Sequence, residues 1–405
     1  MFPKEFIELL QASTGQAEVV LEALEQAPSV SIRLNPSKLT ECPFSDATPV
    51  AWSPYGYLLK ERPVFTLDPL FHAGCYYVQD TSAMYVGHVF RQVTADLQPG
   101  CQVLDLCAAP GGKTTDLAAS LRERFGDRYT LIANEVMRNR FGVLRANVET
   151  WGDARVSCVS RDPSAFGTDP LFHAILADVP CSGEGMFRKD AQALAEWSPK
   201  TVDFCAARSH RILADIWPTL VPGGFLIYST CTFNHLENDD TVAWIAAELG
   251  ADILPLEPFL PVVNTRCGQV LLPGLVPGEG QYVAALRKHG DTTEWAKDAF
   301  PGASAHFSAT GNALSHTGSG ESAFFAAKKM ADASKNATST LPVVNVDRET
   351  ALKYLHGDAI VLPEDAPMGP VTIGYQGHPL GPAKNLGKRC NNLYPKNKRI
   401  RMDIR

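Results

Sequence analysis

The chain has 405 residues, more than one hydrophobic core usually supports, so we expect two or three domains. With 45% hydrophobic and 20% charged residues it has the composition of a globular protein, and no apolar run reaches the roughly 18 residues that a membrane span requires. The N-terminus lacks the basic-then-apolar order of a signal peptide, which predicts a cytoplasmic protein.

The ten cysteines are scattered, and none forms a C-x-x-C pair. This spacing disfavours a disulfide framework and a zinc site, so we expect no bound metal and mostly buried cysteines. A net charge of −7 would disfavour a nucleic-acid partner if the charge were evenly spread. It is not, because residues 384–405 carry eight basic residues and one acid, Asp403. This segment predicts a phosphate-binding surface, with a solvated tail as the alternative.

The first part of the chain predicts a small module. Residues 3–27 have helical periodicity, residues 29–35 resemble a strand closed by Pro36, and an aromatic-rich segment follows at 51–67. We therefore expect an N-terminal α+β module over residues 1–75.

From Cys101 onward, short apolar runs alternate with helical segments. This alternation implies a parallel sheet wound on both faces, so residues 76–290 are expected to form a doubly wound, Rossmann-like α/β domain. A crossover helix is expected over 202–220, followed by a turn at Pro222-Gly223-Gly224. The predicted strands are 102–106, 129–134, 155–159, 172–177, 224–229 and 281–287.

The last part of the chain changes composition. Residues 298–340 are rich in Ala, Ser, Gly and Thr, so we expect a linker over 291–340. Residues 341–405 combine strand-like runs at 359–362 and 371–375 with the basic segment, which predicts a small, mostly-β C-terminal module.

A glycine-rich loop follows the strand at 102–106. Its glycines allow a ligand to approach the backbone, and the next helix offers unpaired N–H groups. Gly112-Lys113-Thr114 invites a P-loop interpretation, but that motif needs glycine where Cys107 stands, so a nucleotide triphosphatase is disfavoured. A tight structural turn is the alternative. The candidate cofactor residues are Cys107, Ala108, Ala109, Pro110, Gly111, Gly112 and Lys113.

Acidic residues follow the next three predicted strands. Glu135 lies about 20 residues after the glycine loop, where an acid can accept hydrogen bonds from ribose hydroxyls. Asp162 and Asp178 follow the third and fourth strands. Because ligands bind outside the carboxyl ends of such strands, these acids are expected to face one crevice. The alternatives are a surface position for Glu135 and ordinary turn chemistry for Asp162.

Two cysteines follow predicted buried strands. Cys181 lies in the run from Asp178 to Gly185, D-V-P-C-S-G-E-G, and Cys231 lies in Ser229-Thr230-Cys231-Thr232. Paired thiols suit covalent addition to an electron-poor ring.

Over residues 30–290 these parts resemble the cytosine-5 RNA methyltransferases of the NOL1/NOP2/Sun family. The run from Asp105 to Thr114 is similar to their S-adenosylmethionine loop. The two cysteine segments resemble their proline-cysteine and threonine-cysteine motifs. Within the family, residues 387–396 resemble the bacterial RsmF-like members that modify 16S ribosomal RNA.

The resemblance implies the following chemistry. C5 of cytosine is a weak nucleophile, so a thiolate must first add to C6, and the family pattern assigns this attack to Cys231. Cys181 would help to remove the C5 proton and free Cys231. Asp178 would donate a hydrogen bond to the ring as a carboxyl kept neutral by burial. S-adenosylmethionine would bind at the glycine-rich loop, Glu135, Asp162 and Asp178.

The expected partner is RNA, as 16S ribosomal RNA or the small ribosomal subunit, bound by a monomer. The base must leave its stack, so the substrate is expected to be single-stranded or opened by residues 1–75 and the PUA-like module 341–405. The alternatives are a transfer RNA methyltransferase and an RNA-binding assembly factor without catalysis. Retention of both Cys181 and Cys231 argues against the second. A DNA methyltransferase fits the Thr230-Cys231 motif less well.

Overall fold

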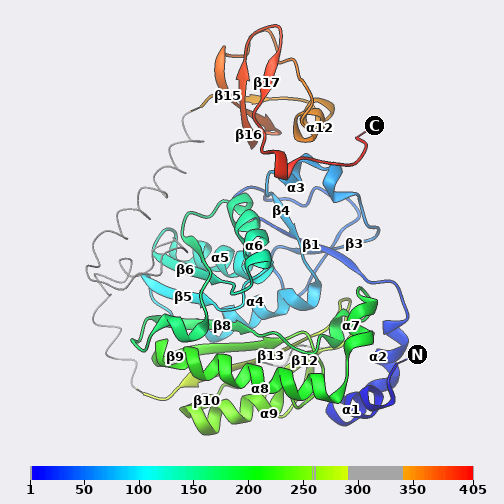
Figure 1. The fold of residues 1–405 in the computed structure, drawn as a ribbon, viewed down its shortest axis with the longest axis vertical. Helices are drawn as coiled ribbons and strands as arrows, with labels where there is room; N and C mark the ends of the chain where they lie inside the picture. The colour runs from blue at the N-terminus through cyan, green and yellow to red at the C-terminus, as the bar shows by residue number, and fades with distance from the viewer. Residues whose placement is uncertain (1, 258, 260, 291–340, 405) are drawn as a thin grey trace.

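The computed structural model describes residues 2–257, 259, 261–290 and 341–404. The predicted linker 291–340 lies outside these described residues. The remaining chain contains an N-terminal, a central and a C-terminal sheet (Figure 1). Across the described ranges, no helix is long and apolar enough to cross a membrane.

The central sheet has nine strands in the order β11-β12-β13-β9-β8-β5-β6-β7, with β10 paired to β13. The five strands from β9 to β7 run parallel, whereas β13 is antiparallel to β9. The strand-helix alternation in the sequence therefore predicted the fold class correctly. The strands are β5 (Cys101–Asp105), β6 (Tyr129–Asn134), β7 (Val156–Val159), β8 (Phe172–Asp178), β9 (Leu220–Thr230), β10 (Ala251–Ile253), β11 (Val263–Asn264), β12 (Gln269–Leu271) and β13 (Gln281–Lys288).

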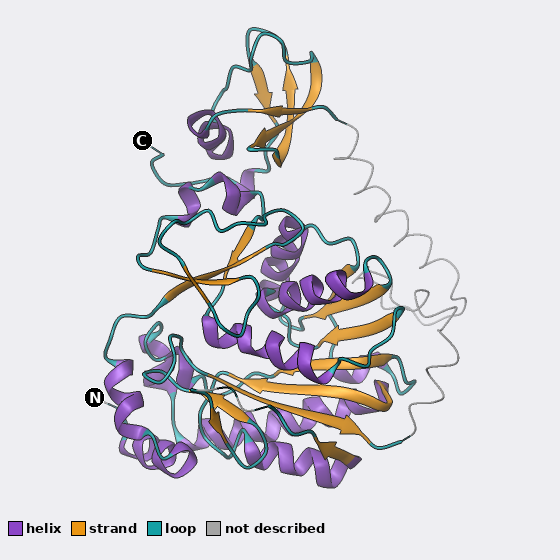
Figure 2. Cartoon of the chain, turned by 180° about the vertical axis from the view of Figure 1, so that it is seen from behind, coloured by secondary structure: helices purple, strands orange, loops and turns teal. Residues whose placement is uncertain are grey.

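Helices cover both faces of this sheet (Figure 2). Helices α4 (Thr81–Val93) and α5 (Gly112–Phe125) pack on one face, and α8 (Pro199–Ile216) and α9 (Asp239–Trp244) pack on the other. Because both faces are buried, the central strands are nearly continuous apolar runs. The other elements of this part are α6 (Arg138–Trp151), α7 (Ala191–Glu196), η2 (Pro163–Phe166), η3 (Glu184–Met186), η4 (Trp217–Thr219) and the π-helical η5 (Ile245–Gly250).

The predicted turn at Pro222-Gly223-Gly224 is instead part of β9. Gly223 adopts a φ of 71°, and the pairing of β8 with β9 shifts register here, so these residues form a bulge within the strand. A Cβ on Gly224 would lie 2.9 Å from the Val221 carbonyl oxygen. Proline and glycine therefore mark an irregular strand at this point, and the strand begins earlier than predicted.

The N-terminal residues begin with two helices, α1 and α2, and then form a four-stranded antiparallel sheet in the order β2-β3-β1-β4, with the short helices η1 and α3 before its last strand. The periodicity over 3–27 predicted helix, and the helix breaks at Gly15, whose φ of 66° is left-handed. Both helices pack against the α8 face of the central sheet. The elements are α1 (Lys4–Thr14), α2 (Ala17–Leu24), β1 (Val30–Leu34), β2 (Thr48–Pro49), β3 (Gly56–Leu59), η1 (Phe65–Leu67), α3 (Pro69–His72) and β4 (Tyr76–Val78).

The C-terminal residues form a separate four-stranded sheet with one helix and its own core. The predicted strand at 371–375 lies within β15, whereas the run at 359–362 makes only an isolated bridge between Ile360 and Cys390. This unit lies beside α3 of the N-terminal part (Figure 1), and Arg348 donates to the Leu67 carbonyl at 2.9 Å. Its elements are β14 (Val343–Asn345), α12 (Arg348–His356), β15 (Gly369–Tyr375), β16 (His378–Asn385), β17 (Cys390–Asn392) and η7 (Lys396–Lys398).

Candidate active site

The glycine-rich loop connects β5 to α5 at the carboxyl edge of the sheet. Gly111 adopts a φ of 110°, a left-handed conformation that favours glycine, and Gly112 is the first residue of α5. The neighbouring strand holds the loop in place. Ala108 donates its N–H to the Asn134 carbonyl at 2.7 Å, and the Asn134 side chain donates to the Leu106 carbonyl at 3.0 Å. The start of α5 is thus set where open α/β sheets bind anionic or polar ligands.

The remaining loop residues contribute through their backbone. Arg140 donates to the Ala109 carbonyl at 2.7 Å, and Asn147 donates to the Pro110 carbonyl at 2.8 Å. The Cys107 side chain packs at the border of the core, and burial raises the pKa of its thiol well above the usual range. Cys107 is therefore an unreactive thiol at this position.

Glu135 follows β6, and only 3% of its surface is exposed. Its Oε1 accepts the Met137 N–H at 2.8 Å. Its Oε2 is buried without a hydrogen bond from any described residue, although the Arg140 guanidinium lies 3.5 Å away. A buried carboxylate oxygen without a hydrogen bond is costly, so this atom is placed to accept one from a ligand hydroxyl.

Asp105, the last residue of β5, also has a buried oxygen without a hydrogen bond, and it was not among the predicted site residues. Its side chain is fully buried, and Oδ2 accepts from the Thr114 hydroxyl at 2.6 Å. Its Oδ1 has no hydrogen-bond partner in the part of the chain that the structure describes. Burial raises the pKa of Asp105 to about 7, and the charges of Asp178 and Glu135 act in the same direction. The carboxyl groups at the end of β5 and just after β6 therefore each have one oxygen without a hydrogen bond from the described residues.

Asp162 follows β7 and caps the short helix η2. Its Oδ1 accepts from the N–H and the hydroxyl of Ser164, at 3.1 and 2.8 Å, and these bonds lower the pKa of Asp162. Its Oδ2 lies 3.8 Å from the Arg211 guanidinium, and 44% of the side chain is exposed. The local contacts account for this residue, and its part in cofactor binding stays a prediction.

A polar cluster joins the glycine-rich loop to the end of β8. The Lys113 ammonium donates to Asp178 Oδ2 at 2.9 Å. Ser229 and Gln281 donate to Asp178 Oδ1, at 2.5 and 3.2 Å. Asp178 therefore accepts hydrogen bonds from three side chains, and its expected role as a donor to the ring stays a prediction. Burial alone would lower the pKa of Lys113, but Asp178 outweighs it and raises the pKa, so this lysine is charged.

The two cysteines lie side by side beyond this cluster. The Cys181 and Cys231 sulfur atoms are 3.3 Å apart, and both residues are half-buried. The hydrogen bond with Cys231, together with burial, raises the pKa of Cys181 well above the usual range. Either thiol can be the donor in this hydrogen bond. The sequence placed the two cysteines at one sheet edge, and the structure brings their sulfur atoms into contact.

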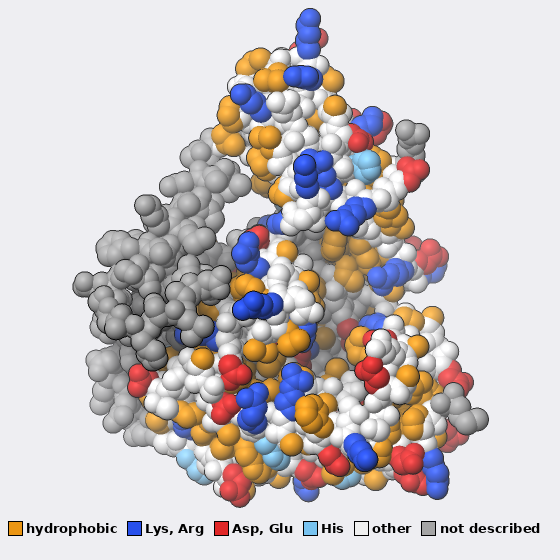
Figure 3. Space-filling model, viewed as in Figure 1, with side chains coloured by type: hydrophobic (Ala, Val, Ile, Leu, Met, Phe, Trp, Pro, Cys, Tyr) orange, Lys and Arg blue, Asp and Glu red, His pale blue; other side chains and the backbone are white. Residues whose placement is uncertain are grey.

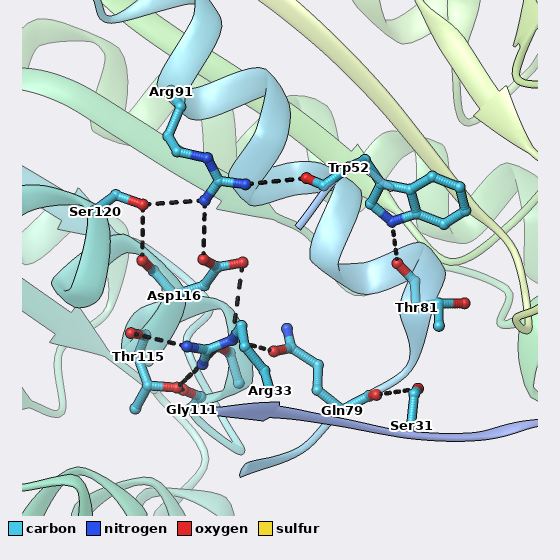
Figure 4. Close-up of polar contacts among 11 residues, drawn as sticks. Ser31, Arg33, Trp52, Gln79, Thr81, Arg91, Gly111, Thr115, Asp116 and Ser120 are labelled. Atoms are coloured by element: carbon cyan, nitrogen blue, oxygen red, sulfur yellow. Dashed lines mark hydrogen bonds and ion pairs between the residues drawn. The ribbon is translucent and has the colours of Figure 1, made fainter. Parts of the chain in front are cut away.

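A buried charge network fixes the start of α5 to the N-terminal sheet (Figure 4). Arg33 on β1 has no exposed surface and donates to the Gly112 carbonyl at 3.1 Å and to the Thr115 hydroxyl at 2.5 Å. Its charge is balanced by Asp116, whose Oδ2 lies 3.9 Å away. Arg91 binds the other Asp116 oxygen at 3.1 Å. The glycine-rich loop is therefore anchored by residues of two separate parts of the chain.

We expect Arg33→Met to reduce the free energy of unfolding by about 3 kcal/mol, because it leaves buried acceptors unpaired and removes a cation beside Asp116. Urea unfolding followed by tryptophan fluorescence measures this change. Arg91→Met is the matched control, since Arg91 is partly exposed and binds the same carboxylate. Equal losses of unfolding free energy in the two variants would contradict the expectation that the fully buried Arg33 contributes more to stability than Arg91.

Sequence reasoning missed several residues of this site. Gln281 stands on β13, and its amide donates to Ser229 at 2.8 Å as well as to Asp178. Arg33 lies 82 residues before Thr115, the residue that it contacts. Neither residue belongs to a local motif. Two features of the sequence could have pointed to them. Gln281 stands at the start of a predicted strand, and Arg33 is the single arginine within the predicted strand 29–35.

Comparisons with known proteins cover most of the chain. A family model described as 16S rRNA methyltransferase RsmB/F matches residues 92–287. A model described as the N-terminal domain of 16S rRNA methyltransferase RsmF matches residues 2–81. A model described as the methyltransferase RsmF PUA domain matches residues 341–400.

Individual relatives agree with these matches. Ribosomal RNA small subunit methyltransferase F of Salmonella paratyphi A is 34% identical over 312 residues, which cover 71% of this chain and 63% of the relative. The chain thus spans about 63% of the length of the curated relatives that it matches. A methyltransferase homolog from Pyrococcus horikoshii is 28% identical with a TM-score of 0.59, covering 71% of this chain and 95% of that one. NSun6 from the same organism, determined with SFG, shares the fold at 19% identity and a TM-score of 0.58, covering 72% and 99%.

Proposed function

Because this chain belongs to the 16S rRNA methyltransferase RsmB/F family, we propose that it transfers a methyl group from S-adenosylmethionine to C5 of a cytosine in RNA. The proposed substrate is 16S ribosomal RNA of the small subunit, as the names of the relatives suggest. The observation that carries the chemistry is the pair of thiols 3.3 Å apart at the edge of the sheet, next to a charged lysine and a carboxylate.

The cofactor site fits the residues present. The unoccupied oxygen of Glu135 suits a ribose hydroxyl, and the loop 107–113 with the start of α5 suits a polar ligand close to the backbone. Asp162 and Asp178 complete the proposed site. When bound, S-adenosylmethionine supplies a methyl group on a positively charged sulfur.

The charges around the thiols favour Cys231 as the nucleophile. Cys231 is among the groups that raise the pKa of Lys113, which places the lysine ammonium near this sulfur. Addition of the Cys231 sulfur to C6 moves the C5–C6 π electrons toward C5, which then takes the methyl group. The pKa of Cys181 is raised by its hydrogen bond with Cys231 and by burial, which favours a protonated thiol beside the nucleophile.

Release requires that the C5 proton leaves. Its bonding electrons re-form the C5–C6 double bond, and the electrons of the C6–S bond return to Cys231. Cys181 is 3.3 Å from the departing sulfur and is placed to give it a proton while taking the proton from C5. Asp178 would hold Lys113 in place beside the thiols.

The surface around this edge suits a phosphate backbone. On the face seen in Figure 3, a hollow opens between α6 and α7, and Lys and Arg side chains are spread over the C-terminal unit and the middle of the molecule. Because a base in a duplex cannot enter such a hollow without leaving its stack, the proposal favours a single-stranded or opened segment.

The proposal is tested with purified protein, S-adenosylmethionine labelled in its methyl group, and three substrates: free 16S ribosomal RNA, small subunits lacking 5-methylcytosine, and transfer RNA. Nucleoside mass spectrometry should find labelled 5-methylcytosine in the ribosomal RNA. Label in transfer RNA alone would show that transfer RNA, not ribosomal RNA, is the substrate. The absence of labelled 5-methylcytosine from all three would refute the proposed reaction.

The basic segment of the C-terminal unit is expected to contact phosphates. Lys388 and Arg389 lie exposed in the turn between β16 and β17. Their joint replacement by alanine should reduce the slope of log affinity against log salt by about 1.4, since each phosphate contact on single strands contributes about 0.7. Filter binding between about 50 and 200 mM salt measures it. The exposed Lys4 and Lys200 of α1 and α8, replaced together, form the control, and an equal slope change there would show a non-local charge effect.

A further inference from the structure

Two buried glutamates join the cysteine segments reciprocally. Glu184, from the segment after Cys181, accepts from the Phe233 N–H at 2.7 Å and the Asn234 amide at 2.9 Å. Glu237 accepts from the Ser182 N–H at 2.9 Å and its hydroxyl at 2.5 Å. Each cysteine segment therefore provides a carboxyl group that binds the backbone of the other, an arrangement we call the glutamate clasp.

A backbone contact completes the clasp. Gly185 donates its N–H to the Cys231 carbonyl at 2.8 Å. A Cβ on Gly185 would lie 2.9 Å from that carbonyl oxygen and 2.8 Å from the Glu279 carbonyl oxygen, so a larger residue would push the segments apart. The separation of the two sulfur atoms is thus set by groups that flank both cysteines.

The clasp is made of two carboxyl groups, although burying uncharged groups at these positions would cost less free energy. Glu184 and Glu237 are each 1% exposed, and within the described ranges neither forms an ion pair. Burial raises the pKa of Glu237 to about 7, and the charge of Glu184 adds to this effect. Glu237 is therefore ionised above neutral pH, in the range where thiols begin to ionise. Burying an unpaired carboxylate costs stability, which points to a use for this charge.

The charges on the two sides of the thiol pair differ in sign. Cys231 is among the groups that raise the pKa of Lys113. The pKa of Cys181 is raised most by its hydrogen bond with Cys231, then by burial and by the charges of Cys231 and Glu237. The other titratable groups that face this cluster are Glu184, the Cys205 thiol of α8 and the Tyr228 hydroxyl of β9. Neither the thiol nor the hydroxyl carries charge near neutral pH, since burial raises the pKa of both.

We propose that Glu184 and Glu237 are positioning residues for the two thiols: the clasp holds Cys181 against Cys231, and the negative charge of Glu237, bound to the residue after Cys181, disfavours attack by Cys181 so that Cys231 alone attacks. This inference rests on the proposed cytosine-5 methylation. The difference in role between two chemically identical groups is thereby assigned to a carboxylate that accepts hydrogen bonds from Ser182 and Asn234.

The test measures thiol reactivity in the full-length protein without RNA or cofactor. The protein is treated briefly with iodoacetamide between pH 6 and 10, and the initial alkylation of each cysteine is quantified by mass spectrometry of its peptide. In the wild type, Cys231 should react at least about tenfold faster than Cys181 at pH 8. Faster or equal reaction of Cys181 would overturn the proposal without any variant.

Two variants of equal shape separate charge from packing. Glu237→Gln should raise the Cys181 rate at pH 8 about tenfold relative to Cys231, because a like charge beside the thiol is lost. Glu184→Gln is the matched control: it keeps the shape of the clasp and leaves the Glu237 charge beside Cys181, so the Cys181 profile should stay in place. Near-ultraviolet circular dichroism checks folding. An unchanged Cys181 profile in folded Glu237→Gln, or equal shifts in both variants, would refute the charge role.

Failure of this proposal can be told apart from failure of the proposed function, because alkylation needs neither RNA nor S-adenosylmethionine. If Cys231 reacts first but no 5-methylcytosine forms, the reaction is wrong and the positioning role survives. If 5-methylcytosine forms while Cys181 reacts first, the positioning role is wrong and the reaction survives.

Discussion

Cys231→Ala is expected to reduce formation of 5-methylcytosine by about 10⁴-fold or more, because it removes the thiol that adds to C6 and then leaves. Nucleoside mass spectrometry of 16S ribosomal RNA after incubation with the variant measures the loss. Since Cys231 is half-buried at the edge of the sheet, the alanine variant should keep its fold and its affinity for S-adenosylmethionine.

The control for this prediction is Cys42→Ala, which replaces another half-buried cysteine, one in the N-terminal part of the chain. It should methylate at the wild-type rate. Normal activity in Cys231→Ala would show that the nucleophile has been assigned to the wrong thiol. In that case the next candidate nucleophile is Cys181, the only cysteine whose sulfur lies in contact with Cys231 in the described part of the chain.

Cys181→Ala is expected to trap the protein on RNA. The variant can still add Cys231 to C6 and methylate C5, but it lacks the thiol that helps to remove the C5 proton, so the adduct accumulates. With substrate RNA and S-adenosylmethionine, a slowly migrating covalent complex should appear on a denaturing gel, and turnover should fall by about 10²- to 10⁴-fold, the usual contribution of acid–base catalysis.

The double variant Cys181→Ala/Cys231→Ala provides the control, because it cannot form the bond that is being trapped. A complex of the same mobility in the double variant would mean that another cysteine is cross-linked. If Cys181→Ala gives no complex and turns over normally, release does not depend on this thiol.

The sequence predicted the central sheet well because its signals are local. Alternating apolar runs and helices determine a parallel sheet, and acids and cysteines placed after strands meet at one edge because parallel strands end together. Gly15 and residues 222–224 show the limit of this reasoning. Gly15 ends a helix inside the segment 3–27 that was predicted as helical, and residues 222–224, predicted as a turn, form a bulge inside a strand.

The parts of the site that the sequence did not reveal depend on tertiary contact. Gln281 reaches Asp178 only because β13 pairs with β9, and Glu237 binds Ser182 across 55 residues. The donors around Asp178 were not foreseen for the same reason, because they come from α5, β9 and β13.

The anchoring of α5 by Arg33 has a consequence for engineering. A graft that exchanged the N-terminal part for that of a relative would also remove the guanidinium seated on the first turn of α5. Such a chimera would need Arg33, Gln79 and Trp151 transplanted as one unit with the helix that they surround, since Gln79 accepts from Arg33 and the Trp151 ring lies 4.7 Å from the guanidinium carbon. The N-terminal sheet and the glycine-rich loop are therefore not separable parts in this fold, and chimeras should be cut outside residues 30–151.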